Sequence, residues 1–349
     1  MIRGLALCVA FCVLGCDDDG ETAADVDGAT GSDAGAGLPD AGDAPDGGEV
    51  PDTGEVPDTG EAPDAAGGDE LGYAPCAVDV RVGRFQVALA DGFTSVQGQV
   101  ASGVEPSVVP APTASAGSCR LLQPRDLFCA PACDAADTCS EDGCIPRPVN
   151  TDVGTVTVTG LLAPVSMSAR APVWFYTNTD PLDHPGFEPG ADISLSADGA
   201  EPFTLRGWGI EPLDVTTAAL TLESGVTAVL EWAAPADPGP ARVEVTLNIA
   251  NHGGTPAWIE CEAPDSGRFE IPASLTDQLL DLGFSGFPSV ALTRRTADSA
   301  QLAAGCVDLM VQSEVVLDVE IPGLVSCSSD DDCTGPDICR VDLTCGSPE

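Results

Sequence analysis

Apolar and polar residues alternate in short runs along most of the chain after residue 73. In the clearest run, residues 242–249, the odd-numbered residues are apolar and the even-numbered ones polar. A period of two is typical of a strand with one buried and one solvated face. About nine or ten such runs lie between Val153 and Ile321, separated by Pro, Gly and Asp. They predict a mainly β protein, an antiparallel β-sandwich of the immunoglobulin-like or jelly-roll kind.

Two other segments add to this pattern. Residues 78–90 and 93–100 are rich in β-branched and aromatic residues and predict a strand pair, with a slip in phase at Gly83 that indicates a β-bulge. Residues 273–282 follow Pro272 and carry leucines at helical spacing. They predict one helix in an otherwise β-rich chain.

The cysteines divide the chain further. Five lie between residues 119 and 144, and four lie between residues 327 and 345. We expect Cys76 to pair with Cys119, and Cys261 to pair with Cys306, because the latter two are the only cysteines between the clusters. The predicted organisation is a β-hairpin plus a first cysteine-rich module (73–150), a β-sandwich (151–325) and a C-terminal cysteine-rich module (326–349).

The segment before residue 73 has a different composition. Residues 17–70 contain eighteen Asp or Glu, no basic residue and little besides Gly, Ala, Pro, Thr and Ser. Such a segment cannot bury enough apolar surface to offset the entropy of ordering it. No stretch of it has the ligand spacing of a calcium-binding loop. We predict that residues 16–72 form a disordered acidic linker, which serves as a stalk.

The first sixteen residues have the features of an export signal. Arg3 is the only charge before an apolar run at 5–14, which is too short to span a bilayer. The run ends in Val13-Leu14-Gly15-Cys16, which resembles a bacterial lipobox. The resemblance implies that residues 1–15 are a lipoprotein signal peptide and that Cys16 carries the lipid. We therefore expect a membrane-anchored lipoprotein of the cell envelope, at the outer membrane or cell surface, with the inner membrane left open.

Fifteen cysteines are present, of which Cys8 and Cys12 leave with the predicted signal and Cys16 takes the lipid. An even number in an exported chain predicts disulfides, here up to six. The twelve cysteines concerned are Cys76, Cys119, Cys129, Cys133, Cys139, Cys144, Cys261, Cys306, Cys327, Cys333, Cys339 and Cys345.

The C-terminal cluster has a regular spacing, with five residues between successive cysteines from Cys327 to Cys345. It resembles a short cysteine-rich repeat of myxobacterial surface proteins and the first half of the dickkopf N-terminal cysteine-rich domain, and residues 129–144 resemble it more loosely. The resemblance implies disulfides rather than any activity, and we expect the first cysteine to pair with the third and the second with the fourth. Zinc clusters typically use Cys-x-x-Cys pairs, so we predict no metal.

The charge excludes several classes of protein. The chain has a net charge of −43, and all thirteen basic residues are Arg. Nucleic acid is not an expected partner, because phosphate binding needs a basic face. The absence of Lys excludes a Walker A loop, a Schiff-base lysine and a Ser-x-x-Lys acylase.

Few residues suggest chemistry. His184 and His252 have turn-like flanks and no catalytic motif, so we predict no catalytic residue and no cofactor. Trp174 and Trp208 are candidates for stacking on a ligand. The predicted function is a non-enzymatic cell-envelope lipoprotein that displays disulfide-stabilised β domains for binding or adhesion to an extracellular glycan or protein. The alternatives are a carbohydrate- or peptide-binding sandwich module and a secreted hydrolase with a carboxylate pair.

Overall fold

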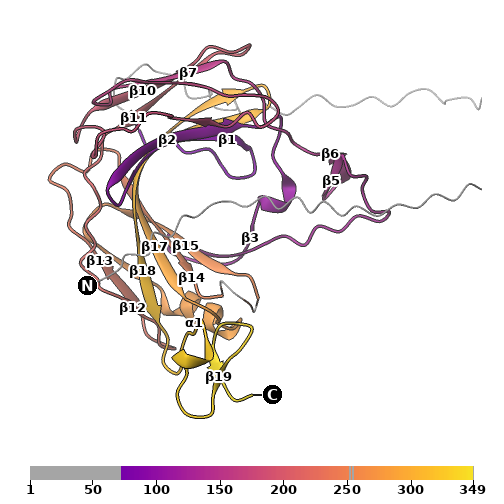
Figure 1. Cartoon of the computed structure of the whole chain (residues 1–349), viewed down its shortest axis with the longest axis vertical. Coiled ribbons are helices and arrows are strands. Elements are labelled where there is room, and N and C mark those ends of the chain that lie inside the picture. The colour runs from indigo at the N-terminus through magenta and orange to yellow at the C-terminus, as the bar shows by residue number, and fades with distance from the viewer. Residues whose placement is uncertain (1–71, 251–252, 254, 349) are drawn as a thin grey trace, which may run out of the picture. The chain divides into compact units, whose positions relative to one another are not determined.

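Two long neighbouring strands, β17 (Ser289–Leu302) and β18 (Gly305–Glu320), run through the middle of the fold (Figure 1). The computed structural model describes residues 72–349 except 251, 252, 254 and 349. The predicted signal peptide, the predicted lipidation site Cys16 and nearly all of the predicted linker lie outside the described residues.

The central pair belongs to a ten-stranded sheet of order β3-β4-β15-β14-β17-β18-β1-β2-β9, with β12 pairing separately with β18. Its other strands are β1 (Arg81–Ala90), β2 (Phe93–Val100), β3 (Ala111–Ala116), β4 (Cys119–Gln123), β9 (Tyr176–Thr177), β12 (Leu220–Thr221), β14 (Arg242–Asn248) and β15 (Trp258–Pro264). A second sheet of order β11-β10-β7-β8 consists of β7 (Thr155–Thr159), β8 (Val165–Ser168), β10 (Asp192–Ala197) and β11 (Phe203–Trp208).

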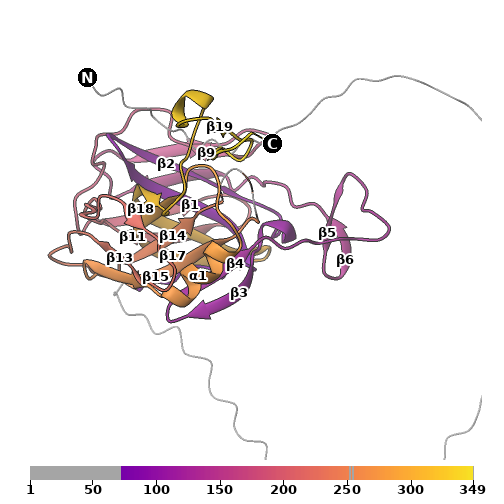
Figure 2. The same ribbon diagram turned by 90° about the horizontal axis from the view of Figure 1, so that it is seen from below.

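Three two-stranded sheets complete the strands: β13 (Ala228–Glu231) with β16 (Arg268–Ile271), β5 (Asp137–Ser140) with β6 (Gly143–Pro146), and β19 (Ile338–Cys339) with β20 (Cys345–Gly346). The helical elements are α1 (Ala273–Asp281) and the short 3-10 turns η1 (Pro106–Val108) and η2 (Asp330–Asp332). In both views the β5–β6 hairpin stands apart from the large sheets (Figures 1 and 2).

Two hydrophobic cores lie on one face of the ten-stranded sheet. The first core joins β1, β2 and the first half of β18 to the four-stranded sheet, through side chains such as Phe85, Leu195 and Leu309. The second core joins β14, β15 and the first half of β17 to β13 and α1, through side chains such as Leu247 and Leu230. Because β17 and β18 are long enough to contribute to both cores, one sheet covers two sandwich-like packings.

The alternation pattern accounts for these strands. Val243, Val245 and Leu247 of β14 are fully buried in the second core, while their polar neighbours point to the opposite face. The register of β1 shifts between Arg81 and Gly83, which confirms the predicted bulge. Helix α1 begins after Pro272 and buries Leu275 and Leu279, as predicted, and it lies against β3, β4 and β15 (Figure 2).

The predicted mainly β sandwich with small disulfide-rich modules is confirmed, and the structure adds a mixed strand pattern. Most pairs are antiparallel, but β1 and β12 each pair with β18 in parallel. The prediction placed residues 73–150 in a unit separate from the sandwich at 151–325. The structure places β1 and β2 in the same sheet and the same core as β18. Local patterns do not reveal a pairing between strands more than two hundred residues apart.

Six disulfides link the twelve predicted cysteines. The predicted pairs Cys76–Cys119 and Cys261–Cys306 are wrong: Cys76 bonds to Cys306, and Cys119 bonds to Cys261. The parallel pairing of β1 with β18 sets Arg81 beside Cys306, and β4 pairs Cys119 directly with Cys261. Sheet register, rather than nearness in the sequence, therefore selects these partners.

The two small modules share one disulfide pattern. In each, the first cysteine bonds to the third and the second to the fourth, which confirms the interleaved pairing expected for the C-terminal module: Cys129–Cys139, Cys133–Cys144, Cys327–Cys339 and Cys333–Cys345. In each module the third and fourth cysteines also lie opposite each other on the two strands of a short hairpin. Within the part of the chain that the structure describes, no helix is long and apolar enough to cross a membrane.

Candidate functional site

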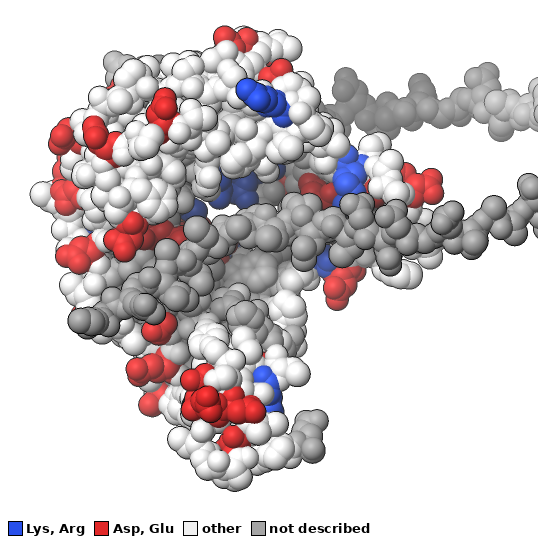
Figure 3. All heavy atoms as spheres, in the orientation of Figure 1, with Lys and Arg blue, Asp and Glu red and all other residues white. Residues whose placement is uncertain are grey.

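The face of the ten-stranded sheet opposite the cores is strongly charged. Along β14, the polar residues Arg242, Glu244 and Thr246 alternate with the buried apolar ones, and β1, β15, β17 and β18 likewise place Arg, Glu and Asp on this face. The sheet curves toward this face (Figure 1). Figure 3 shows basic side chains inside the resulting hollow, beneath β1 and β2, while acidic side chains are spread over the outer surface.

A cavity of about 670 Å³ occupies this face, a volume within the range of small-ligand sites. Five of the thirteen arginines of the chain line it. The charged lining residues are Arg81, Arg84, Arg120, Arg125, Arg295, Asp79, Glu244, Glu260 and Glu262. The cavity also has an apolar wall, formed by Val78, Val109, Pro110, Pro112 and Leu122. We refer to it as the charged cavity.

One end of the charged cavity has two guanidinium groups around one carboxylate. Oδ2 of Asp308 lies 3.3 Å from Nη2 of Arg84 and 3.7 Å from Nη1 of Arg81. Oδ1 of the same carboxylate accepts the backbone N–H of Cys76 at 2.6 Å. The Asp308 side chain is fully buried, whereas both arginines are about a quarter exposed. Burial, together with the charge of Arg84, lowers the pKa of Arg81.

The other end has three glutamates on two neighbouring strands. Glu244 and Glu262 are direct cross-strand partners of β14 and β15, and Arg295 of β17 bridges them, with Nη2 at 2.5 Å from Glu244 Oε2 and 3.9 Å from Glu262 Oε2. Glu260 pairs with Arg120 at 2.7 Å. This end therefore has three carboxylates and two guanidinium groups.

Burial raises the pKa of Glu244, and the nearby Glu260 raises it further, although Arg295 opposes this shift. Burial alone would lower the pKa of Arg295, but Glu244, Tyr73 and Glu262 outweigh it, and the net shift is upward. Arg84 is also among the charges that act on Glu244, although β17 and β18 lie between their strands. The curvature of the sheet thus brings the two ends within electrostatic range of each other.

Residues 73–79 cross this face as a strap. The Cys76–Cys306 disulfide joins the strap to β18, and Ala74 N–H donates to Ala297 O at 3.0 Å. Arg295 Nε donates to the Tyr73 hydroxyl oxygen at 2.8 Å, and burial raises the pKa of that hydroxyl. Residues 75–79 form part of the cavity wall. The first described residues of the chain are therefore built into the charged cavity.

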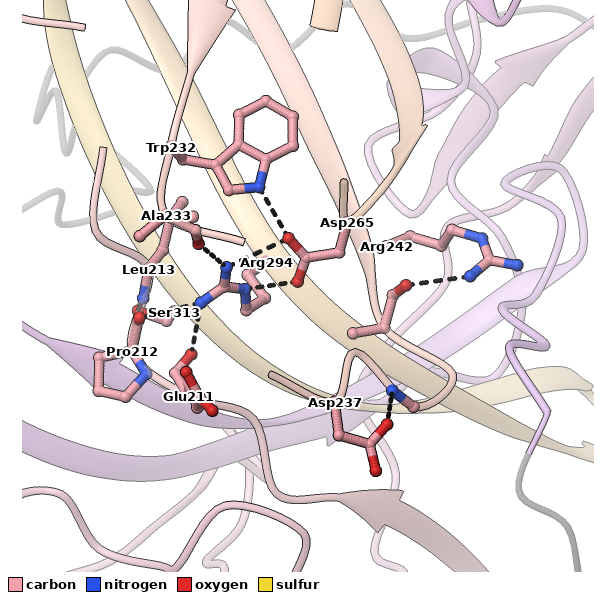
Figure 4. A network of polar contacts seen from close by, with 12 residues as sticks. Glu211, Pro212, Leu213, Trp232, Ala233, Asp237, Arg242, Asp265, Arg294 and Ser313 are labelled. Carbon is pink, nitrogen blue, oxygen red and sulfur yellow. Dashed lines mark hydrogen bonds and ion pairs between the residues drawn. The ribbon is translucent and has the colours of Figure 1, made fainter. Parts of the chain in front are cut away.

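A second cavity of about 160 Å³ lies where the two cores meet, and Trp208, Gly190, Pro238 and Asp237 are among its lining residues. Arg294 and Asp265, an almost fully buried ion pair with Nε 2.6 Å from Oδ2, also line it. Figure 4 shows how this pair is held. Arg294 donates to the carbonyl oxygens of Glu211, Pro212 and Ala233, and Trp232 Nε1 donates to Asp265 Oδ1 at 2.7 Å.

The pair has a structural rather than a ligand-binding geometry. Every nitrogen of the Arg294 guanidinium already donates to a protein oxygen. On β17, Arg294 lies on the same face as Val290 and Leu292 of the second core and Leu302 of the first. Arg294 therefore lies between the two cores, at a position where the contact is polar rather than apolar.

The predicted stacking residues lie in different surroundings. Of the two cavities described above, Trp208 lines the second and Trp174 lines neither. Both rings are half-buried. Gly239, at a φ of 49°, lies over the indole of Trp208, since a Cβ there would be 2.9 Å from Nε1. This close contact leaves less of the ring for a ligand, and ligand stacking on either ring stays a prediction.

The two histidines differ in what the structure shows of them. His184 Nδ1 lies 3.3 Å from the Thr94 hydroxyl, and His252 lies outside the described residues. The three metal-like groups of Cys and Asp in the described ranges are made of disulfide-bonded cysteines, with Asp308 beside one of them. Bonded sulfurs cannot act as thiolate ligands, so these groups provide no zinc site.

No motif in the sequence predicts the charged cavity. Its arginines are distributed over β1, β4, β17 and the loop after β4, and no motif connects them. The available signal was the identity of the residues that alternate with the core-facing ones, because Arg and Glu recur at these positions in β1, β14 and β15. Their convergence depends on strand order.

Comparison with known proteins adds little. No protein-family model matches the chain, and no curated protein matches it. Among solved structures, the crystal structure of the FN1–FN3 domains of chicken CNTN1 matches over 63% of this chain and 71% of that one, at 8% sequence identity and a TM-score of 0.17. A likeness this weak supports no argument about function. The described part is a β domain with disulfide-rich modules, and its function has to be inferred from its site.

Proposed function

We propose that this protein is a non-enzymatic binding protein of the cell envelope, anchored by a lipid on Cys16, whose ligand occupies the charged cavity. The observation that carries the proposal is the gathering of five of thirteen arginines in one cavity of a chain with a net charge of −43. Acidic side chains that serve only to keep a protein soluble do not require five arginines in one cavity. Partly exposed, charge-paired side chains over an apolar wall are typical of specific polar recognition.

The rigidity of the site supports binding. Its arginines and glutamates project from paired strands of one sheet, and the Cys76–Cys306 and Cys119–Cys261 disulfides fix its strap and its floor. Side chains held in this way lose little conformational freedom when a ligand binds, which favours affinity. The lipid anchor and the acidic stalk would present this cavity away from the membrane.

A thermal-shift panel tests the binding site. The purified chain is heated with free amino acids, short peptides, neutral and acidic saccharides, and polyamines. A ligand at a hundred times its Kd stabilises the native state by about 2.7 kcal/mol. Such a stabilisation gives a readily measured increase in Tm. We expect a shift from at least one class, reduced by Arg84→Gln and kept by Arg268→Gln. Arg268 is a matched control, because it pairs with Glu231 and Glu270 on the β13–β16 sheet outside the charged cavity.

Two outcomes would count against a ligand in the charged cavity. One is a panel with no shift in any class, and the other is a shift of equal size in both variants. The anchor is tested separately with Cys16→Ala, which should move the protein from the membrane to the soluble fraction. Membrane association that persists in this variant would contradict lipidation at Cys16.

A hydrolase is a second candidate, favoured by one observation. Glu244 has a raised pKa and lies directly across from Glu262, and a carboxylic acid beside a carboxylate is the arrangement of many glycosidases. However, Arg295 pairs with both groups, and its charge favours two carboxylates over an acid and a base. Release of reducing sugar from a polysaccharide panel, lost in Glu244→Gln, would select the hydrolase.

A further inference from the structure

We infer that the ligand of the charged cavity is a short peptide, with its terminal carboxylate at Arg81 and Arg84 and an ammonium group at Glu260 and Glu262. This inference rests on the proposed function and adds the chemical class of the ligand. It follows from the distribution of hydrogen-bond donors and acceptors at the two ends of the cavity, from the distance between those ends, and from the charge of the whole chain.

The first end has more donors than acceptors. Two guanidinium groups have ten N–H bonds between them, and both are directed at one oxygen of Asp308, whose other oxygen already accepts the Cys76 N–H. Arg84 Nε is buried and has no hydrogen-bond partner among the described residues. Buried donors are almost always paired. The Arg81 and Arg84 end therefore lacks an acceptor, and a carboxylate, with two oxygens and a negative charge, is the group that matches two arginines.

The second end has more acceptors than donors. Three carboxylates share two guanidinium groups and the Tyr73 hydroxyl, which is hydrogen-bonded to Glu262, while the nearest Arg295 nitrogen is 3.9 Å from Glu262, too far for a hydrogen bond. The Glu262 side chain is 44% exposed, so a ligand can reach it. An ammonium group has three N–H donors and a positive charge, and it would supply what this end lacks.

The strand order sets an upper limit on the distance between the two ends and favours a peptide over a single amino acid. Arg84 lies on β1 and Glu262 on β15, four strand spacings apart in the sheet order, which is about 19 Å along a flat sheet. The curvature of the sheet shortens this path (Figure 1). An extended peptide covers about 3.3–3.6 Å per residue, so about three to five residues match the site. The apolar wall, which includes Val109 and Leu122, would contact the side chains between its ends.

The charge of the whole chain favours this ligand over an acidic polymer. A net charge of −43 repels a long polyanion such as a polyuronate and attracts a ligand with an excess of positive charge. Arg81 and Arg84 then act only at short range, on the terminal carboxylate of the peptide. A basic peptide with a free carboxyl terminus satisfies both the long-range and the short-range condition.

Affinity selection on the purified full chain tests the inference. Three pooled tetrapeptide libraries serve as probes: one with free termini, one amidated at the carboxyl terminus and one acetylated at the amino terminus. Peptides that co-elute with the protein are identified by mass spectrometry. We expect peptides from the free library to be retained, and C-terminal amidation to weaken their binding about tenfold or more, since a hydrogen bond to a charged group is worth a factor of this order.

Three variants show which side chains cause the preference for free peptide termini. Arg84→Gln should abolish the preference for the free acid over the amide, Glu262→Gln should weaken the preference for the free amine, and Arg268→Gln should keep both preferences. Equal retention of acid and amide would overturn the inference. If no peptide binds while another class in the thermal-shift panel does so through Arg84, the inference fails and the proposed function stands. If nothing binds, both fail.

Discussion

Replacing Arg294 with Met should destabilise the protein more than any other single loss of an arginine in the described part. Arg294 donates to both oxygens of Asp265 and to three backbone carbonyls. Both side chains of the pair are almost completely buried. Without Arg294, a carboxylate stays buried with the Trp232 N–H as its one partner among the described residues.

Removing one member of a buried ion pair typically costs about 3–5 kcal/mol, and we expect Arg294→Met to fall in this range. The free energy of unfolding is measured by urea denaturation with the disulfides intact. Arg268→Met is the matched control: its pairs with Glu231 and Glu270 are exposed, and its loss should be several-fold smaller. The double variant Arg294→Met/Asp265→Leu should lose less than the two single variants added together, because it removes the stranded charge.

The reasoning would be refuted by an Arg294→Met protein that folds with a free energy of unfolding within about 1 kcal/mol of the unchanged chain, well below the cost of a stranded buried charge. Strict additivity in the double variant would also contradict it, since coupled neighbours show interaction energies of about 0.5–3 kcal/mol. Either result would mean that water reaches the Arg294–Asp265 pair between the two cores.

Three further predictions concern packing, disulfides and pH. Gly98→Ala would place a Cβ 2.2 Å from a Phe ring carbon of β1, and we expect a loss of about 1–3 kcal/mol in urea denaturation, whereas Gly103→Ala, with its nearest atom at 3.8 Å, should lose much less. Replacing Cys76 and Cys306 together by Ala removes a link across 230 residues and should cost about 5 kcal/mol if chain entropy dominates; an unchanged unfolding midpoint would contradict this. Hydrogen bonds from backbone N–H groups lower the pKa of Asp332 below its ordinary value of 3.8. The stability that these hydrogen bonds contribute is present above pH 3.8 and is lost as the pH falls through the lower pKa of the folded state. Amide protection factors in the C-terminal module, which are corrected for the pH dependence of intrinsic exchange, should therefore fall only on strong acidification.

Local sequence pattern was sufficient for the elements but not for their partners. The alternation at 242–249, the bulge at Gly83 and the helix after Pro272 each depend on neighbours within about ten residues, and each was predicted correctly. The pairing of β1 with β18 joins residues more than two hundred positions apart. Nothing local specifies such a contact, and for the same reason the partners of Cys76 and Cys119 were assigned wrongly.

The residues of the charged cavity were likewise predictable as a polar strand face, but their convergence was not. The polar face of β14, including Glu244, was recognised as the face away from the core. That this face would meet Arg81 and Arg84 depends on the order of four strands and on the curvature of the sheet, neither of which a single sequence encodes locally. The buried Arg294 shows the opposite failure: the period of two puts it on the apolar face of β17, its charge predicts an exposed position, and the fold buries it with a partner.

The most direct test of the charged cavity as a ligand site is the NMR signal of the arginine Nε–H groups, followed during titration of the full chain with the tetrapeptides selected above. The Arg84 Nε–H has no partner in the described structure, and its signal reports on a carboxylate that binds the partly exposed guanidinium of the same side chain. We predict that the Arg84 and Arg81 signals shift with a saturable dependence on peptide concentration, while those of Arg268 and Arg294 stay in place. Signals of Arg84 and Arg81 that do not move, or that move no more than that of Arg268, would contradict the assignment of the cavity as the binding site.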